Sequence, residues 1–271
     1  MSADALATGR EVRESLKVRE NVERMTDEKL SAYREALRTM MGRRDNRGYQ
    51  FFAGWHGVPF QLCWHQHPYF LPWHRGYLYH FELALQDVDP EVTLPWWDWV
   101  DGAGLPDTFR TRTTQRRRNL LFDAPIEPYG VQRRPDWPQR TFREPGKLMT
   151  PAPLAPPLRP RDGWLMSATS YTEFNRRLTF LHDNVHVWVG GTMGDPDWAA
   201  YDPLFWAHHT MVDRLWRIWQ HRNPGALPGA AVLNAKMTYA RPPAFLGREL
   251  IDAKALGYEY AGVTGTVRGT S

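Results

Sequence analysis

The chain has 271 residues, of which 42% are hydrophobic, and it includes 13 Trp and 12 Phe. This is enough apolar material for one large core, so we predict a single domain over residues 1–271. The sequence contains no apolar run of about 18 residues, which excludes an ordinary membrane-spanning helix. The net charge of +4 comes without a nucleic-acid-binding motif, so we expect no nucleic-acid partner.

The first predicted helix follows Thr26. Thr26 is a favourable N-cap residue and precedes an acidic first turn. Apolar residues then recur at helical spacing, at Leu30, Tyr33, Leu37, Met40 and Met41. This pattern predicts a packing helix.

Three histidines follow between residues 56 and 74. His56 and His65 lie in a less regular stretch, and Pro72 marks the first turn of a helix. The inner stripe of that helix is predicted to hold His74, Tyr77, Leu78, Phe81 and Leu85. Beyond it, the segment LPWWDW is interpreted as core packing by Trp96, Trp97 and Trp99, with Asp98 as a hydrogen-bond partner.

Eleven of the 22 prolines lie between Asp101 and Ser170. Such density forbids long helices and disfavours central strands. We predict a long ordered excursion over the helices, with a disordered linker as the alternative. Nine arginines in this region are interpreted as a solvated face: Arg110, Arg112, Arg116, Arg117, Arg118, Arg133, Arg134, Arg140 and Arg143.

The second group of histidines lies on two predicted helices. We expect Thr172 to cap the first, in which His182 and His186 stand four residues apart and project from one face. The second helix, within residues 201–220, places His209 on its apolar side. His208 is rotated by roughly 100° from His209 on the same helix.

Two sets of three histidines suggest two metal ions. Neutral imidazoles without an added carboxylate or thiolate suit copper, zinc or iron, and they are especially compatible with a Cu(I)/Cu(II) pair. Spacing alone does not choose the metal. A zinc or iron hydrolase would predict a carboxylate ligand or a catalytic Glu beside the histidines, and no such motif is recognisable.

Four segments resemble the signatures of the tyrosinase family of coupled binuclear copper proteins. They are HQHPYFLPWHRGYLYHFELAL, LPWWDW, LHDNVHVWVGG and DPLFWAHHTMVDRLW. The likeness extends from about Arg19 to Tyr258-Glu259-Tyr260, which resembles the tyrosine motif that closes the family's central domain. It implies a mainly α fold: a helix bundle holding a binuclear copper site, with long Pro-rich ordered loops, few short strands and a core at about 19–260. No C-terminal lid domain is expected.

The resemblance assigns a copper ion to each set of histidines. It implies that His56, His65 and His74 bind one ion and that His182, His186 and His209 bind the other. With O₂ as co-substrate, such a site oxidises small o-diphenols to o-quinones and in some members hydroxylates monophenols first. An o-aminophenol oxidase of secondary metabolism and a haemocyanin-type O₂-binding protein are the alternatives.

Cys63 is the only cysteine and precedes His65 by two residues. This resembles the Cys-x-His element of fungal tyrosinases and molluscan haemocyanins, in which a thioether joins the two side chains. The resemblance therefore implies a Cys63–His65 cross-link that fixes the orientation of the ligand ring. A free buried thiol is the alternative.

Two acidic residues are candidates for the proton transfer that monophenol hydroxylation requires. Many bacterial tyrosinases have Asn after the first ligand of the second copper and Glu several residues before it; here Asp183 occupies the first place, Thr179 aligns near the second, and Glu173 is close. We also expect Val187, Met193, Pro196 and Trp198 to form the substrate pocket. Asp213 is expected to accept a hydrogen bond from a ligand imidazole or to pair with Arg214 or Arg217.

The amino end lacks the apolar core of a secretory signal, so a cytoplasmic location is the default expectation. Some bacterial relatives are exported with a helper protein that carries the signal and delivers copper. The resemblance therefore leaves a copper-delivery partner and an export route open.

Overall fold

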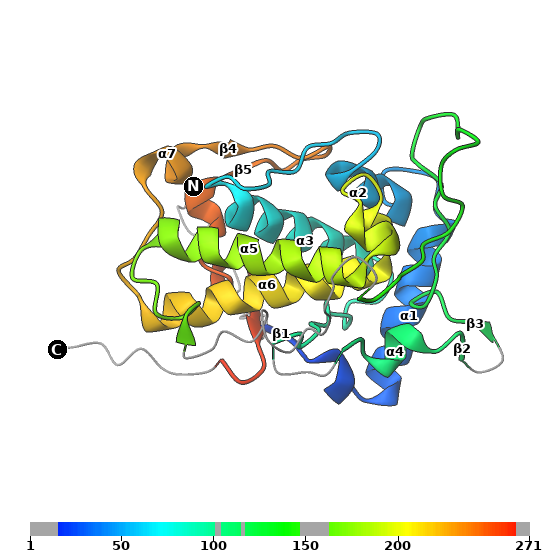
Figure 1. Cartoon of the computed structure of the whole chain (residues 1–271), viewed down its shortest axis with the longest axis horizontal. Helices are drawn as coiled ribbons and strands as arrows, with labels where there is room; N and C mark the ends of the chain where they lie inside the picture. The colour runs from blue at the N-terminus through cyan, green and yellow to red at the C-terminus, as the bar shows by residue number, and fades with distance from the viewer. Residues whose placement is uncertain (1–15, 101–103, 115–116, 147–162, 264–271) are drawn as a thin grey trace, which may run out of the picture.

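The computed structural model describes residues 16–100, 104–114, 117–146 and 163–263. Three long helices, α3 (Phe70–Gln86), α5 (Tyr171–Val189) and α6 (Pro203–Arg222), lie side by side along the long axis of the molecule (Figure 1). Helices α1 (Asp27–Gly42) and α2 (Tyr49–His56) lie towards one end of this layer. Short helices α4 (Asp107–Arg110) and α7 (Ala230–Asn234) complete the α-helices of the described residues.

The strands are short and form three separate pairs. β1 (Lys17–Arg19) runs parallel to β6 (Tyr258–Tyr260), which joins the two ends of the described chain. β2 (Thr113–Thr114) pairs with β3 (Arg117–Arg118), and β4 (Lys236–Met237) pairs with β5 (Phe245–Leu246), both antiparallel. Single 3₁₀ turns lie at Val22–Arg24, Gly191–Gly194, Ala199–Tyr201, Gly247–Leu250 and Lys254–Leu256. The predicted mainly α fold is confirmed.

Side-chain caps explain where three of the helices begin. Thr26 caps α1 as predicted, because its hydroxyl accepts a hydrogen bond from the backbone of Lys29. The cap of α5 is Ser170 rather than Thr172, so that prediction was wrong by two residues. Asp202 caps α6, and Pro203 occupies its first turn.

Aromatic side chains fill the space between the helices. Phe81 of α3 stacks on Trp206 of α6 with ring centroids 3.5 Å apart, and Phe174 of α5 stacks on Trp219 at 4.6 Å. The predicted core residues Trp96, Trp97 and Trp99 are buried. Burial of such large rings holds the three helices in a fixed register, on which the positions of the histidines depend.

The described part of the Pro-rich excursion packs on the helices through buried Phe109, Leu121 and Ile126, which supports an ordered path for residues 104–114 and 117–146. Arg143 is a correction to the predicted solvated face. Its guanidinium is buried and forms an ion pair with Asp202, the residue that caps α6, at 2.5 Å. The segment TPAPLAPPLRP lies outside the described residues. None of the described helices combines the length and apolar character needed to cross a membrane.

Candidate metal centre

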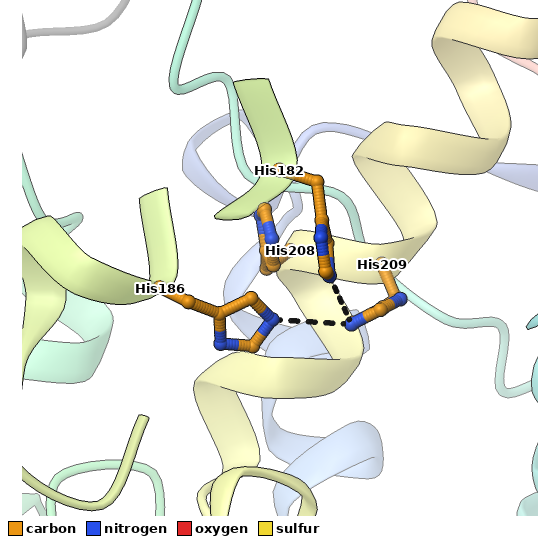
Figure 2. Close-up of side chains that lie close together, drawn as sticks. All are labelled: His182, His186, His208 and His209. Carbon is orange, nitrogen blue, oxygen red and sulfur yellow. Dashed lines mark hydrogen bonds between the residues drawn. The ribbon is translucent and has the colours of Figure 1, made fainter. Parts of the chain in front are cut away.

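Seven histidines gather where α2, α3, α5 and α6 meet. His56 is the last residue of α2, so it lies on a helix rather than in the irregular stretch that was predicted. His74 comes from α3, and His65 comes from the loop between these two helices. The remaining four are His182 and His186 on α5 and His208 and His209 on α6 (Figure 2).

Four of the rings are oriented through their Nδ1 atoms. In each case the partner is a carbonyl or carboxylate oxygen, which accepts a hydrogen bond, so Nδ1 carries the proton and Nε2 is left with a lone pair. The Nδ1 to oxygen distances are 3.1 Å from His56 to Pro196, 2.8 Å from His74 to Phe70, 2.9 Å from His182 to Asp183, and 2.7 Å from His186 to Met193.

The Nε2 atoms converge on one another. Those of His56 and His65 are 3.1 Å apart, and Nε2 of His209 lies 3.1 Å from that of His182 and 3.3 Å from that of His186 (Figure 2). Nε2 of His74 is buried and has no hydrogen-bond partner among the described residues. Facing lone pairs and an unpaired buried nitrogen are costly without a ligand, so this donor set fits bound metal ions.

The two sets adjoin each other through His209. Donor atoms of His56, His74 and His209 lie within 4.8 Å of one another, as do those of His182, His186, His208 and His209. Burial lowers the pKa of these buried imidazoles, and neighbouring histidines lower it further; the pKa of His186 falls to about 4, mainly through burial. The rings are therefore neutral at pH 7, the form in which histidine binds metals.

His208 lies behind the convergent nitrogens. Its ring stacks on that of His182, with centroids 5.0 Å apart and planes 14° apart (Figure 2). It is fully buried, and its two ring nitrogens have no hydrogen-bond partner among the described residues. Because Nε2 of His209 meets those of His182 and His186, His209 is the better placed of the pair to bind a metal.

A pocket of about 260 Å³ opens from the histidines to the surface. Of the residues predicted to line it, Val187, Met193 and Pro196 do so, together with Asp183. Trp198 is not among the lining residues: it is buried and its ring packs against Trp137 at 5.3 Å. Gln66 also lines the pocket and was not predicted from the sequence. Its φ of 50° is a left-handed conformation, which a glycine would have suggested in the sequence and a glutamine does not.

Comparison with known proteins decides the family. Residues 46–222 match the family model for the common central domain of tyrosinase. The chain belongs to the tyrosinase family. Family members use a binuclear copper site and O₂, and the histidine geometry above fits such a site.

Relatives in this family include both tyrosinases and haemocyanins. The chain is 35% identical to the tyrosinase of Streptomyces glaucescens over 183 residues, covering 58% of this chain and 64% of the relative. It is 28% identical over 226 residues to a G-type haemocyanin of Enteroctopus dofleini, covering 75% of this chain and 8% of that long protein. The chain thus spans less than two thirds of the length of these relatives.

Solved structures share the fold. A functional unit of octopus haemocyanin matches with a TM-score of 0.77 at 24% identity, covering 92% of this chain and 69% of that one. An Aspergillus oryzae pro-tyrosinase matches with a TM-score of 0.74 at 21% identity, covering 91% and 71%. At these identities the likeness shows the tyrosinase fold alone.

The two acidic candidates for proton transfer lie in different places. Asp183 lines the pocket and its Oδ1 atom lies 2.9 Å from Nδ1 of His182. Glu173 lies in the first turn of α5, where it pairs with Arg177 at 2.5 Å, and it is not among the pocket-lining residues. Burial raises the pKa of Asp183. The structure thus gives no support to Glu173 as a site residue.

Asp213 is also a correction. It was expected to bind a ligand imidazole or to pair with Arg214 or Arg217. Instead its carboxylate accepts hydrogen bonds from Arg75 at 2.6 Å and from Arg19 at 3.3 Å. It also accepts hydrogen bonds from the hydroxyls of Tyr258 and Tyr260 at 2.6 and 2.5 Å. Asp213 therefore ties the tyrosine motif to α3 and α6.

Proposed function

We propose that this chain is a copper-dependent oxidase that converts o-diphenols to o-quinones with O₂. The observation that carries the proposal is the convergence of buried, neutral Nε2 atoms at the base of a pocket open to the surface. We assign His56, His65 and His74 to one copper ion and His182, His186 and His209 to the other. A copper pair held there supplies the electron transfer between the diphenol and O₂.

The protein holds the ligand rings and keeps the base of the site dry. The carbonyls of Phe70, Pro196 and Met193 fix three of the rings through Nδ1. Phe205 packs on His209 at 4.0 Å between ring centroids, and Phe70 packs on His182 at 4.8 Å. These apolar rings exclude water from the ligand nitrogens, which strengthens interactions with the metal ions.

We assign substrate positioning to the pocket walls. Val187, Met193 and Pro196 offer an apolar surface to a flat ring. Among the described residues that line the pocket, Asp183 is the one carboxylate. It is therefore our candidate to accept the proton of a monophenol, if monophenols are substrates, and to hold the His182 ring.

We further propose that Cys63 and His65 form a thioether. Sγ lies 3.5 Å from Nδ1 and 3.9 Å from Nε2 of His65, so it faces the ring carbon between the two nitrogens. Joining sulfur to that carbon would break one S–H and one C–H bond, and the two electrons and two protons would pass to O₂, the co-substrate of the proposed reaction, to give H₂O₂. Intact mass of the copper-loaded protein should show the loss of two hydrogens, whereas an unchanged mass and a titratable thiol would show a free cysteine.

Oxygen uptake tests the function. Copper-loaded protein is assayed with catechol, then with tyramine and 2-aminophenol, with the copper-free protein as control. Uptake with catechol supports the proposal, and uptake with tyramine extends it to monophenols. Uptake with 2-aminophenol alone would replace it with an aminophenol oxidase.

The likeness to haemocyanin units supports a second candidate, a reversible O₂ binder. This reading predicts O₂ binding that reverses under vacuum, with no uptake on any of the three substrates. The open pocket beside the histidines favours the enzyme, because a carrier needs room for O₂ alone.

A further inference from the structure

A second groove adjoins the metal pocket along α5. Its volume is about 500 Å³, and Gln66 and Asp183 line both spaces. The two spaces therefore meet at these two residues. The side chains of Gln66 and Asp183 are hydrogen-bonded to each other at this boundary, so a ligand whose ring lies at the histidines would reach the groove by passing over them.

One face of α5 forms a wall common to both spaces. Arg176, Phe180, Asp183 and Val187 follow one another at steps of four, three and four residues, which places them on one side of the helix. Val187 and Asp183 line the metal pocket, and Asp183, Phe180 and Arg176 line the groove. Arg176 precedes Asp183 by about two turns, or roughly 10 Å along the helix axis.

The opposite wall is fixed to α5 by hydrogen bonds. The side chain of Asn175 donates to the carbonyl of His67 at 3.2 Å, and the hydroxyl of Tyr171 donates to the carbonyl of Pro68 at 2.5 Å. His67 also packs against Trp64, with ring centroids 4.8 Å apart. These bonds hold residues 66–68 beside the helix, so the groove is built into the fold.

The two spaces differ in charge: Asp183 lines both, and Arg176 lines the groove alone. The described lining of the metal pocket contains no lysine or arginine, and its one formal charge is the carboxylate of Asp183. In the groove, Arg176 is exposed and forms no ion pair with any described acidic residue, since Glu173 pairs with Arg177. Phe180 lies between Arg176 and Asp183 on this face of α5, is 54% exposed and offers an apolar surface.

From this arrangement we propose a specificity site for extended phenols. The groove binds the tail of a phenol or catechol whose far end, about 10 Å from the ring, carries a carboxylate. Gln66 and Asp183 lie where the tail leaves the ring, Phe180 contacts the tail, and Arg176 pairs with the acid. An acid close to the ring would instead face Asp183 and be disfavoured. This inference rests on the proposed function.

Paired substrates test it. Dihydrocaffeoyl-β-alanine carries an acid at a suitable distance, and its terminal carboxamide is the neutral counterpart. An exposed ion pair should favour the acid by about two- to fivefold in kcat/KM. Arg176→Ala should bring the acid-to-carboxamide ratio to about one, and Arg176→Glu should invert it. Raising the salt concentration to about 0.5 M should shrink the ratio in the wild type but not in Arg176→Ala.

Arg222→Ala is the matched control, because Arg222 is an exposed arginine in the last turn of α6 and is not among the residues that line either space. It should keep the wild-type ratio. An acid-to-carboxamide ratio that does not change in Arg176→Ala overturns the inference, even if catechol is oxidised normally.

A binding measurement separates this inference from the proposed function. If no diphenol is oxidised, the proposed function fails, yet the groove can still be tested. Calorimetric titration of copper-free protein with the monophenol analogue of the acid should show weaker binding to Arg176→Ala than to the wild type or Arg222→Ala. Equal affinities for all three proteins would reject the groove.

Discussion

Helices α3 and α6 each contribute residues to two buried polar regions. The regions differ in what provides the partners of their buried polar atoms. His74 and Arg75 are neighbours on α3, and His209 and Asp213 are one turn apart on α6. The histidines point to the metal centre, whereas Arg75 and Asp213 form an ion pair at 2.6 Å. Arg19, which also donates to the buried carboxylate of Glu82 at 2.6 Å, and the tyrosine motif complete this second region. We call it the Asp213 network (Arg19, Arg75, Glu82, Asp213, Tyr258 and Tyr260).

In the Asp213 network the protein provides nearly every partner. Asp213 accepts four hydrogen bonds, and Arg75 also donates to the carbonyls of Leu250 and Ile251 at 3.1 and 2.6 Å. Burial alone would raise the pKa of Asp213, but the charges of Arg75 and Arg19 outweigh it and hold the pKa below its ordinary value. The histidines lack such partners for Nε2. One region is completed by the fold and the other by a ligand.

The largest expected effect is on copper binding and activity, and it comes from a change in the metal centre. His209→Gln removes the imidazole shared by both clusters, so it should reduce bound copper below two per chain. Loss of a ligand's hydrogen-bond partner alone costs about 10–100-fold in metal affinity or activity, so loss of the ligand should cost at least a hundredfold in diphenol oxidation. Copper analysis and oxygen uptake measure both quantities. Full copper occupancy and activity would remove His209 from the ligand set.

Asp213→Asn should lower the stability of the fold while leaving all the proposed copper ligands in place. It leaves Arg75 buried without its carboxylate, whereas Arg19 keeps its pair with Glu82. Breaking a buried pair in this way typically costs about 3–5 kcal/mol of unfolding free energy. Urea unfolding of the copper-free protein measures this. Glu91→Gln, which alters the exposed pair with Lys17, is the control and should cost no more than about 1 kcal/mol. A similar loss in both variants would mean that the network does not stabilise the fold.

Carboxylates on α5 provide a smaller test within the metal centre. Asp183→Asn weakens the hold on Nδ1 of His182 and should lower copper affinity or turnover by about 10–100-fold, with Asp183→Glu retaining part of it. Glu173→Gln should change turnover by less than about twofold, since a surface pair contributes little. Copper titration followed by steady-state kinetics distinguishes loss of metal from loss of turnover. Equal effects of both variants would contradict the placement of Glu173 away from the pocket.

Sequence patterns predicted the helices in which apolar residues recur along one buried face. α1 and α3 show apolar stripes, and the spacing of His182 and His186 predicted a shared face of α5. α2 was missed because all eight of its residues are buried, which leaves no amphipathic period to read. Ser170 and Thr172 are both good caps, and sequence alone does not decide which hydroxyl meets a free backbone N–H.

Long-range partners were the part that the sequence did not predict. The family motif predicted which histidines would gather in one place, but it did not predict ion-pair partners that are distant in the chain. Asp213 pairs with a residue 138 positions away, and Arg143 with one 59 positions away. Periodicity shows which side of a helix is buried and leaves open what is packed there. Glu173 shows that closeness in sequence does not ensure closeness in space. It precedes His182 by nine residues on α5, so the two side chains point about half a turn apart and are separated by roughly 13 Å along the helix axis.

His80 offers the smallest and most specific test, because it is a buried imidazole that the protein itself satisfies. It lies on α3 outside both regions, and its Nε2 atom donates to the carbonyl of Pro243 at 3.0 Å. Burial lowers its pKa to about 4, so it is neutral in the folded state at pH 6, whereas an unfolded histidine takes up a proton below about 6.5. This residue therefore makes unfolding easier as the pH falls from about 6.5 towards 4.

Replacing the ring removes that dependence. In the copper-free protein, His80→Gln should flatten the fall in unfolding free energy over this range by up to about 1.4 kcal/mol per pH unit, the value for one proton. Urea unfolding at several pH values measures it, and His221→Gln, which changes a half-exposed histidine at the end of α6, is the control. The histidines of the metal centre titrate equally in both proteins, so the difference isolates His80. If the unfolding free energy fell with pH at the same rate in both variants, the prediction would be wrong, because His80 would then take up its proton in the folded protein.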